Sequence, residues 1–380
     1  MGNIRRTLSI CERLTQEIPS LSILIVTGSP VIHAMRIPHK VDYVKLPCLS
    51  RDEQETFSAK YWDMNMQELI HFRSELIASC IKRFNPNLIV VDKKPLGLDG
   101  ELLEALTYVK KYLKKTRIIL GLRDVLDEPA TTIPIWQKNR YYEGIRDYYD
   151  QVWIYGSRKI FDAAKEYQMP DLVAQKVIYT GFLGRSRPSI SPNALRAKLG
   201  LNGELFVLVM AGGGGDGFPI LSTYIKGIRN HYGLPHSRSL LISGPEMPTA
   251  QRCDLAHCCQ ADTSLNFLEF SDEIETILSS ADVVVSMGGY NTICEILSFR
   301  KKAVIIPRVY PVKEQYVRAQ VLANMGLIEM IHPDDLTKAT LFAAIARAAQ
   351  QRNVLFEVVK NIDLNGLERI TNLTREILDC

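Results

Sequence analysis

The feature that most constrains this chain is a regular alternation of short, continuously apolar segments with longer amphipathic ones. The short kind includes "NLIVVD" (87–92), "LFVLVMAG" (205–212) and "DVVVSMG" (282–288). The long kind includes "ELIHFRSELIASCIKRF" (68–84), whose apolar residues recur close to the 3.6-residue period of an α-helix. Strands that are apolar throughout, rather than at alternate residues, indicate a parallel sheet covered by helices on both faces. We therefore predict an α/β fold.

The alternation runs through the chain twice, which predicts two doubly wound domains. The 380 residues are enough for two hydrophobic cores. The segment "TGFLGRSRPSISPN" (180–193) is rich in Gly, Ser and Pro and is the predicted boundary, which gives domains at 1–182 and 183–380. Inside the first domain, "LRDVLDEPATTIPIWQKNR" (122–140) is interpreted as a long irregular stretch of functional interest.

Composition and charge exclude several classes of protein. The formal net charge of +4, from 46 basic and 42 acidic residues, is too mild to indicate nucleic-acid binding. The basic run "KKYLKKTR" (110–117) is interpreted as a solvated helix end, with a phospholipid-facing patch as the alternative. Eight scattered cysteines favour a reducing compartment, and "CDLAHCCQ" (253–260) is interpreted as carrying incidental thiols rather than a metal site. With no apolar signal region, a cytoplasmic location is expected.

Two glycine-rich turns follow apolar segments in the second half, "AGGGGDG" (211–217) and "MGGYN" (287–291). Ligands of doubly wound sheets bind at the carboxyl ends of the strands, where such turns lie. Glycine lets a backbone N–H approach a ligand closely, and the following helix offers unpaired N–H groups and a positive dipole end. One such turn is equally well explained by tight packing, but the pair favours binding of a phosphate or diphosphate.

Two familiar nucleotide motifs fail here. Gly212, Gly214 and Gly217 match G-x-G-x-x-G, but the next apolar segment ends in Ser243 and Gly244 instead of the acid that would hold a ribose. No Gly-Lys-Ser/Thr follows either turn, so a P-loop is also rejected.

Glu295 lies seven residues after Gly288, close to two helical turns, and so shares its helix face. A carboxylate at this position can accept hydrogen bonds from two ribose hydroxyls beside a bound diphosphate. The alternative is a solvated helix glutamate, the usual environment of this residue type.

Several segments of the chain resemble a known family. "SMGGYNTICEIL" (286–297) and "KKAVIIPRVYPVKEQYVRAQVLANMGL" (301–327) resemble the donor-binding domain of glycosyltransferase family 28, which includes the bacterial enzyme that adds N-acetylglucosamine to the lipid-linked peptidoglycan precursor. "MAGGGGDG" (210–217) and "GLRDVLDEP" (121–129) resemble a less characterised bacterial branch of predicted glycosyltransferases. The resemblance implies a GT-B fold, in which two Rossmann-like domains face each other across a cleft. The terminal helix (363–378) would return to the first domain.

The resemblance also implies roles for individual residues. The second glycine turn would bind the donor diphosphate, the first turn would form the opposing wall, and Glu295 would hold the ribose. An acid–glutamine pair would contact the sugar, and Phe270 would lie near the base. The implied donor-binding residues are Gly213, Gly214, Phe270, Ser286, Gly288, Gly289, Asn291, Thr292, Glu295, Glu314 and Gln315. Tyr290 departs from the family, since many relatives carry a small residue there.

The start of the chain is the larger departure. Relatives begin with a strand that leads into a Gly-x-Gly-His or Gly-x-Gly-Asn turn and a helix, whereas here Gly2 and Asn3 match the end of the turn and Arg5 and Arg6 the helix start. Loss of this central strand would leave a gap and two rows of unpaired backbone groups. A start codon placed too late is the favoured explanation; a fragment, or another segment filling the gap, are the alternatives.

The expected chemistry uses no metal and no cofactor, because no Asp-x-Asp triplet occurs and the nucleotide-sugar is a substrate. The glycine turns would stabilise the negative charge of the leaving group. Direct displacement of that group by the acceptor would invert the anomeric centre. Asp92 and Asp124, each at a strand end, are the candidate general bases, although such positions also suit turn residues. Asn3, Arg5 and Arg123 are expected to hold the acceptor or a phosphate.

The sequence therefore predicts an inverting, metal-independent glycosyltransferase with a nucleotide-diphosphate sugar, UDP in particular, as donor. The acceptor, lipid-linked or a small molecule, is open, and a peripheral contact with the inner face of the membrane is an additional expectation. The alternatives are a nucleotide-sugar epimerase of the same architecture and a non-catalytic nucleotide-sugar-binding protein. No nucleic-acid partner is expected.

Overall fold

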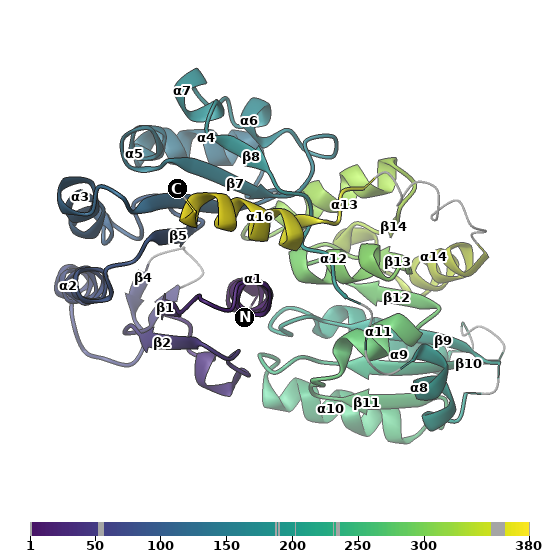
Figure 1. Cartoon of the computed structure of the whole chain (residues 1–380). Coiled ribbons are helices and arrows are strands. Elements are labelled where there is room, and N and C mark those ends of the chain that lie inside the picture. Colours follow the sequence, from purple (N-terminus) through teal and green to yellow (C-terminus); the bar gives the residue numbers. More distant parts are fainter. Residues whose placement is uncertain are drawn as a thin grey trace. The chain divides into compact units, whose positions relative to one another are not determined.

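The computed structural model in Figure 1 describes the whole chain except residues 1, 52–56, 187, 189–190, 202, 231, 233–235, 351–361 and 380. It divides into two compact units. The N-terminal unit comprises Met1–Phe182 together with Asn365–Cys380, and the C-terminal unit comprises Leu183–Leu364.

The C-terminal unit is a doubly wound domain, as the apolar segments predicted. Its sheet has six strands, all parallel, in the order β11-β10-β9-β12-β13-β14. The strands are β9 (Leu205–Met210), β10 (Ser237–Ile242), β11 (Leu265–Leu268), β12 (Val283–Ser286), β13 (Lys302–Ile305) and β14 (Glu329–Met330). The helices are α8 (Pro192–Lys198), α9 (Phe218–Arg229), α10 (Thr249–Gln260), α11 (Ile274–Ser280), α12 (Tyr290–Ser298), α13 (Glu314–Asn324) and α14 (Lys338–Gln350), with a 3-10 turn at Pro333–Asp335.

The core of this unit explains why its strands are apolar throughout. One face of the sheet packs against α9, α10 and α14 through fully buried side chains such as Leu221, Leu255 and Leu341. The neighbouring residues of the same strands, such as Leu208 and Val284, are completely buried as well. Both faces are therefore covered, and the continuous apolar pattern follows from that burial.

The N-terminal unit has a broken sheet. Four parallel strands form one part, in the order β5-β6-β7-β8, two parallel strands form another, β1-β2, and β3-β4 is an antiparallel hairpin. The strands are β1 (Ile23–Thr27), β2 (Val41–Lys45), β3 (Leu49–Arg51), β4 (Phe57–Ala59), β5 (Leu88–Asp92), β6 (Arg117–Arg123), β7 (Gln151–Tyr155) and β8 (Val177–Tyr179). The helices are α1 (Gly2–Glu17), α2 (Met66–Phe84), α3 (Leu103–Tyr112), α4 (Pro129–Lys138), α5 (Tyr141–Tyr148), α6 (Ala163–Glu166), α7 (Asp171–Ala174) and α16 (Gly366–Leu378), with a 3-10 turn at Ile32–Ala34.

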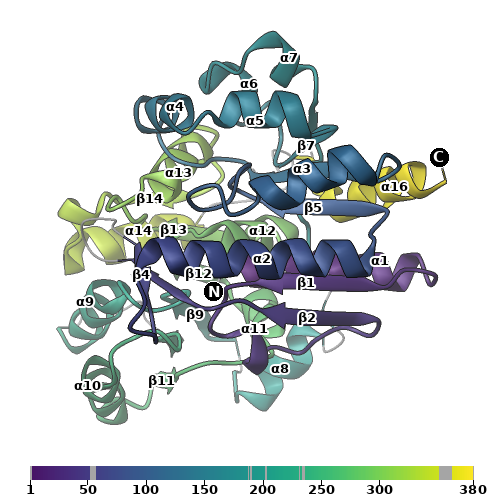
Figure 2. The same cartoon turned by 90° about the vertical axis from the view of Figure 1, so that its left-hand side faces the viewer.

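The break lies where the sequence predicted a missing central strand. Within the described residues no ladder joins β1 to β5, and in Figure 2 β5 lies above α2 and β1 below it. β5 is the edge strand of the four-stranded part, and Val90 in its middle is 45% exposed. The parallel α/β class is therefore confirmed, and within the described residues the first sheet is divided between β1 and β5.

The segment 122–140 is not a long irregular stretch, and that interpretation was wrong. β6 ends at Arg123, and a helix, α4, begins at Pro129. Proline is favoured at the first helical position, whereas Pro134 inside the helix obscured the periodic pattern. Trp136 holds this helix in place because its ring packs against the ring of Tyr142, 5.3 Å away between centroids.

The last helix, α16, belongs to the N-terminal unit. The N–H of Gly366 donates to the carbonyl of Phe182 at 3.0 Å, and Arg369 donates to the carbonyl of Thr180 at 2.6 Å. A Cβ on Gly366 would lie 2.6 Å from two backbone oxygens, so this close approach requires glycine. Arg375 of α16 donates to the carbonyl of Glu17 at the end of α1. None of the described helices combines the length and the apolarity that crossing a membrane would need.

Candidate functional site

The two glycine turns follow neighbouring strands of the C-terminal sheet. After β9 the chain adds β10 and β11 on one side, then returns to place β12 against the other side of β9 and continues to β13 and β14. The strand order therefore reverses between β9 and β12, as the C-terminal unit in Figure 1 shows. Such a reversal opens a crevice at the carboxyl ends of the strands, which is the usual ligand site of open α/β sheets.

The second turn combines one glycine needed for structure with one that faces open space. Gly288 has φ of +73°, and a Cβ there would lie 2.7 Å from Cγ2 of Ile305. Gly289 precedes α12, and a Cβ on it would meet nothing within 4 Å. The N-cap residue of α12 is Gly289, which has no side chain to cap the helix, and the N-terminal end of a helix carries unpaired N–H groups and the positive end of its dipole.

The first turn also divides into two kinds of glycine. A Cβ on Gly213 would lie 2.6 Å from a carboxylate oxygen of Glu246, and one on Gly214 would lie 2.3 Å from the carbonyl of Ser243. These two glycines, expected to form a phosphate wall, therefore allow the turn to pack against the loop after β10. Gly212 and Gly215 face open space.

The side chains around the second turn are buried and connected. Ser286, the last residue of β12, accepts a hydrogen bond from the N–H of Gly288 at 3.3 Å. Asn291 accepts from Nη2 of Arg185 at 3.4 Å, and Thr292 is also buried. These residues therefore hold the turn and the start of α12 rather than projecting into solvent.

The structure places Glu295 differently from the expectation that it would face a ribose. Its side chain is 0% exposed, and Oε1 lies 4.0 Å from Nε of Arg185. The Arg185 side chain is itself 6% exposed and also lies 3.5 Å from Glu275. The reason is that residues 183–185 run along α12, where the backbone N–H of Arg185 donates to Ser298 at 2.9 Å. Glu295 is thus a partner of a buried arginine.

Tyr290, the departure from the family pattern, does not project into the open space at the turn. It is 4% exposed, and its hydroxyl accepts a hydrogen bond from the N–H of Leu183 at 3.3 Å. The guanidinium carbon of Arg318 lies 5.7 Å from the centre of the tyrosine ring, and Arg318 donates to the carbonyl of Gly288 at 3.4 Å. Tyr290 and Arg318 therefore support the turn from inside.

The remaining donor-side residues lie at the same edge of the sheet. Oε1 of Gln315 accepts a hydrogen bond of 3.0 Å from the N–H of Arg308, so this glutamine fixes the loop after β13. Glu314 precedes it at the start of α13 and is 4% exposed. Phe270 follows the edge strand β11 and is 56% exposed.

In the N-terminal unit, Asp92 and Asp124 end neighbouring strands as expected. Asp92 accepts a hydrogen bond of 2.6 Å from Arg6, and its side chain is 33% exposed, whereas Arg6 is 2% exposed. Asp124 is buried at 2% exposure. Burial, with the Asp92 carboxylate as a second cause, raises the pKa of Tyr155 well above the usual value.

The other acceptor-side residues are spread around this edge. Arg123 is the last residue of β6, while Asn3 and Arg5 lie in the first turn of α1. Arg6 was predicted only to mark the start of a helix, and no role was predicted for Arg185, Arg308 or Arg318. The sequence around a lone arginine does not show which residues it contacts, so only contacts between distant segments could identify these four.

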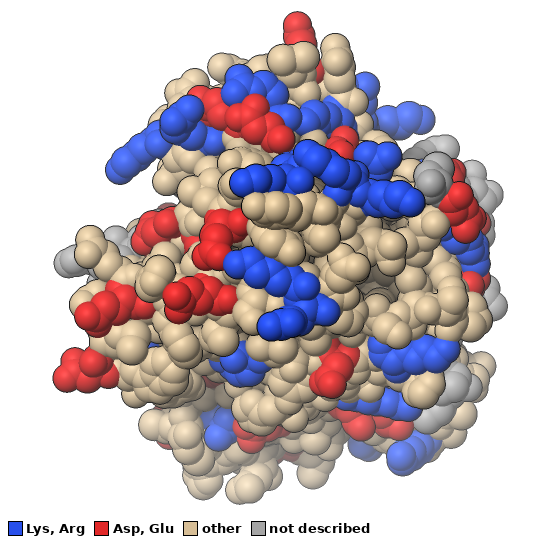
Figure 3. Space-filling model, turned by 60° about the vertical axis from the view of Figure 1, so that its left-hand side comes forward, with Lys and Arg blue, Asp and Glu red and all other residues tan. Residues whose placement is uncertain are grey.

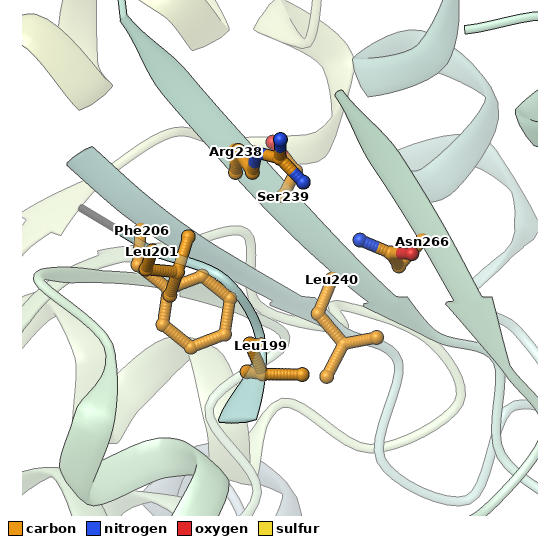
Figure 4. Close-up of a pocket in the computed structure, with 7 residues that line it drawn as sticks. All are labelled: Leu199, Leu201, Phe206, Arg238, Ser239, Leu240 and Asn266. Atoms are coloured by element: carbon orange, nitrogen blue, oxygen red, sulfur yellow. The ribbon is translucent and has the colours of Figure 1, made fainter. Parts of the chain in front are cut away.

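A small pocket elsewhere in the C-terminal unit does not belong to this site (Figure 4). It is lined by Leu199, Leu201, Phe206, Arg238, Ser239, Leu240 and Asn266. Most of these residues come from the amino-terminal halves of β9, β10 and β11, away from the edge with the glycine turns. Its volume of about 20 Å³ accommodates a single water molecule and not a nucleotide.

These features define a GT-B protein, built from two Rossmann-like units with glycine turns at the switch point of the second. Acinetobacter baumannii MurG has this fold, with a TM-score of 0.61 and 12% identity over 99% of this chain and 96% of that chain. A Listeria monocytogenes protein described as a putative UDP-N-acetylglucosamine 2-epimerase also has this fold, with a TM-score of 0.64 and 10% identity over 98% of this chain and 93% of that chain.

The C-terminal part of the chain is similar in sequence to a known family. Residues 206–373 match the glycosyltransferase family 28 C-terminal domain. The UDP-N-acetylglucosamine–N-acetylmuramyl-(pentapeptide) pyrophosphoryl-undecaprenol N-acetylglucosamine transferase of Sulfurihydrogenibium sp. (strain YO3AOP1) is 37% identical over 86 residues, 22% of this chain and 25% of that protein. The Acetivibrio thermocellus protein of the same name is 24% identical over 205 residues, which are 53% of this chain and 55% of that protein. The chain thus matches a quarter to about half of the length of these curated relatives.

Proposed function

We propose that this protein is a glycosyltransferase that takes its sugar from a nucleotide-diphosphate donor, UDP-linked in particular. The observation that carries the proposal is the pair of glycine turns on neighbouring strands at the switch point. The names of the curated relatives support a UDP-sugar donor. Gly289 and Gly215 leave open space where a diphosphate can approach the backbone.

The leaving diphosphate is stabilised by the protein backbone rather than by a metal. The start of α12, whose N-cap is Gly289, offers N–H groups and a positive dipole end to the developing charge. Arg185, held between Glu275 and Glu295, donates to Asn291 and so fixes the start of α12. Direct attack by the acceptor hydroxyl on the anomeric carbon then inverts its configuration.

Of the two candidate bases, we propose Asp92. A general base has to reach the hydroxyl that it deprotonates. A third of the Asp92 side chain is exposed, whereas Asp124 is almost completely buried. Arg6 orients the Asp92 carboxylate through Oδ1, which leaves the other oxygen for the acceptor.

For the acceptor we propose a lipid-linked molecule met at a membrane surface. An aromatic patch of Tyr61, Trp62 and Phe72 is 69%, 49% and 38% exposed, and the rings of Trp62 and Phe72 lie 5.9 Å apart. Lys60 lies 5.3 Å from the ring of Tyr61, the aromatic-plus-cation combination that suits a lipid interface.

The patch lies near the candidate base, whereas the basic run does not. Lys94, two residues after Asp92, lies 5.0 Å from the ring of Phe57, in the hairpin that leads to Tyr61. Lys110 and Arg117 lie beside Asp150 at the opposite, amino-terminal edge of the strands. In the view of Figure 3 basic and acidic side chains are interspersed, so attraction to an anionic surface would come from local clusters.

The test is a transfer assay on the full chain with UDP-N-acetylglucosamine labelled in the sugar, with and without a bacterial total-lipid extract. We expect UDP to bind in calorimetry, and label to enter the organic phase only when lipid is present. A second UDP-sugar formed without lipid would establish the epimerase instead. Absence of UDP binding would refute the proposal. If UDP bound but no sugar was transferred to lipid or to water-soluble acceptors, the protein would be a nucleotide-sugar-binding protein instead.

A further inference from the structure

Arg308 lies at the edge of the sheet that carries the glycine turns. It is the third residue after β13, whose neighbour β12 leads into the second turn. The backbone N–H of Arg308 is held by Gln315 at 3.0 Å, so the base of the side chain has a fixed position.

From there the side chain reaches across the end of β12. Its Nη1 lies 3.7 Å from Oδ2 of Asp216, which belongs to the first turn, after β9. β13 and β9 are the two neighbours of β12, so their axes are separated by two strand spacings, about 10 Å. The guanidinium therefore joins the segments that follow β13 and β9, the two neighbours of the strand that leads into the second turn at Gly288 and Gly289.

The contact with Asp216 does not use all the N–H donors of the Arg308 guanidinium. It carries five N–H donors, and its contact with Asp216 is longer than a hydrogen bond. Nε of Arg308 is buried and has no hydrogen-bond partner among the described residues. A Cβ on Gly212, Gly215 or Gly289 would meet nothing within 4 Å, so the two turns leave open space at this edge of the sheet.

The contact with Asp216 is of a kind that a ligand can replace. The side chains of Arg308 and Asp216 are 34% and 47% exposed, and exposed ion pairs contribute little to stability. A phosphate offers the guanidinium a bidentate, more highly charged partner.

We propose that Arg308 is a ligand of the donor diphosphate and that Asp216 is its internal competitor, which holds the guanidinium until the donor arrives. The inference rests on the proposed function, because it requires a diphosphate at the glycine turns. It adds Arg308 to the residues that bind the donor, and it states that Arg308 exchanges Asp216 for the diphosphate when the donor binds. Donor binding should therefore be sensitive to the charge of Asp216 although that residue need not touch the donor.

Calorimetry with UDP and with uridine on the full chain tests this, using Arg308→Ala, Asp216→Asn, the double variant and Arg347→Ala. Arg347 is a matched control because it forms an exposed ion pair with Glu329, at the start of β14. We expect Arg308→Ala to lower the affinity for UDP at least tenfold and to leave the affinity for uridine unchanged. Asp216→Asn should raise the affinity for UDP two- to fivefold. Arg347→Ala should change neither affinity.

The double variant separates competition from any other effect of Asp216. If Asp216 acts through Arg308, the gain from Asp216→Asn disappears when Arg308 is absent. The inference alone would be overturned if Arg308→Ala bound UDP with wild-type affinity. The same holds if the gain in UDP affinity from Asp216→Asn persisted in the double variant. A wild-type chain that does not bind UDP would overturn the proposed function and the inference with it. Thermal melting of each variant excludes loss of the fold as the cause.

Discussion

Nη2 of Arg6 donates a hydrogen bond of 2.6 Å to Oδ1 of Asp92, and this ion pair ties α1 to the carboxyl end of β5. The guanidinium carbon of Arg6 lies 5.7 Å from the ring centre of Tyr155, the last residue of β7. One buried arginine thus connects the first helix to two strand ends at the edge where the acceptor is expected.

Replacement of Arg6 by alanine should destabilise the protein. Breaking a buried ion pair costs about 3–5 kcal/mol, and the partial exposure of Asp92 reduces this to about 2–4 kcal/mol. Urea unfolding measures the difference. Lys82→Ala is the control, since Lys82 and Glu104 are both about half exposed and should contribute less than about 0.5 kcal/mol. Equal effects of the two substitutions would contradict the buried arrangement.

The two glycines of the second turn should respond in opposite ways to alanine. Gly288→Ala introduces a Cβ at positive φ and 2.7 Å from Ile305, so we expect a loss of about 1–3 kcal/mol in unfolding free energy. Gly289→Ala has an ordinary φ of −58° and open space, so stability should change by less than about 0.5 kcal/mol. The new methyl group instead occupies the diphosphate space, and UDP affinity should fall at least tenfold in calorimetry. If Gly289→Ala binds UDP normally, the diphosphate does not lie there.

Glu295→Gln distinguishes the two roles considered for this residue. Because the carboxylate faces Arg185 and is fully buried, we expect the variant to lose about 1–3 kcal/mol of stability. The ratio of the affinities for UDP and 2′-deoxy-UDP should stay at the wild-type value. A ratio that falls to one in the variant would restore Glu295 as the ribose ligand and would require a rearrangement around Arg185 on binding.

The two candidate bases can be separated by asparagine substitutions. Asp92→Asn should lower the rate of label transfer by about 10²–10⁴-fold while UDP binding stays unchanged, as expected for removal of a general base. Asp124→Asn should act mainly through stability, because the side chain is 2% exposed. A transfer rate for Asp92→Asn within threefold of the wild type would exclude Asp92 as the base.

Alkaline unfolding should follow the buried tyrosines. Burial raises the pKa of Tyr149, Tyr167 and Tyr224 above the ordinary value of 10.0, because the charged form would be desolvated. Above pH 10 the unfolded chain therefore binds fewer protons than the folded one, and the free energy of unfolding falls as the pH rises. Below pH 10 this contribution is constant. Tyrosinate absorbance and circular dichroism should change together above pH 10; full ionisation of all tyrosines before unfolding would contradict the burial.

Much of the architecture could be predicted because it rests on local patterns. Continuous apolar strands such as Val283–Ser286 indicate a sheet covered on both faces, and the glycines after them mark the turns at its edge. The prediction failed for α4, where Pro134 interrupted the periodic pattern that Trp136 and its aromatic neighbours nevertheless hold in a helix. Local patterns also could not separate Gly288, required by its φ, from Gly289, which faces open space.

By itself, the sequence determined that the chain forms parallel α/β layers with an interrupted first sheet and two glycine turns, because these depend on periodicity and on residue type. Only the tertiary structure decided that the turns are neighbours across β9 and β12, that Glu295 faces Arg185, and that Arg308 reaches Asp216. Each of these relationships joins segments far apart in the chain. The partner of a charged side chain is set by which strands lie side by side, and no local pattern encodes that.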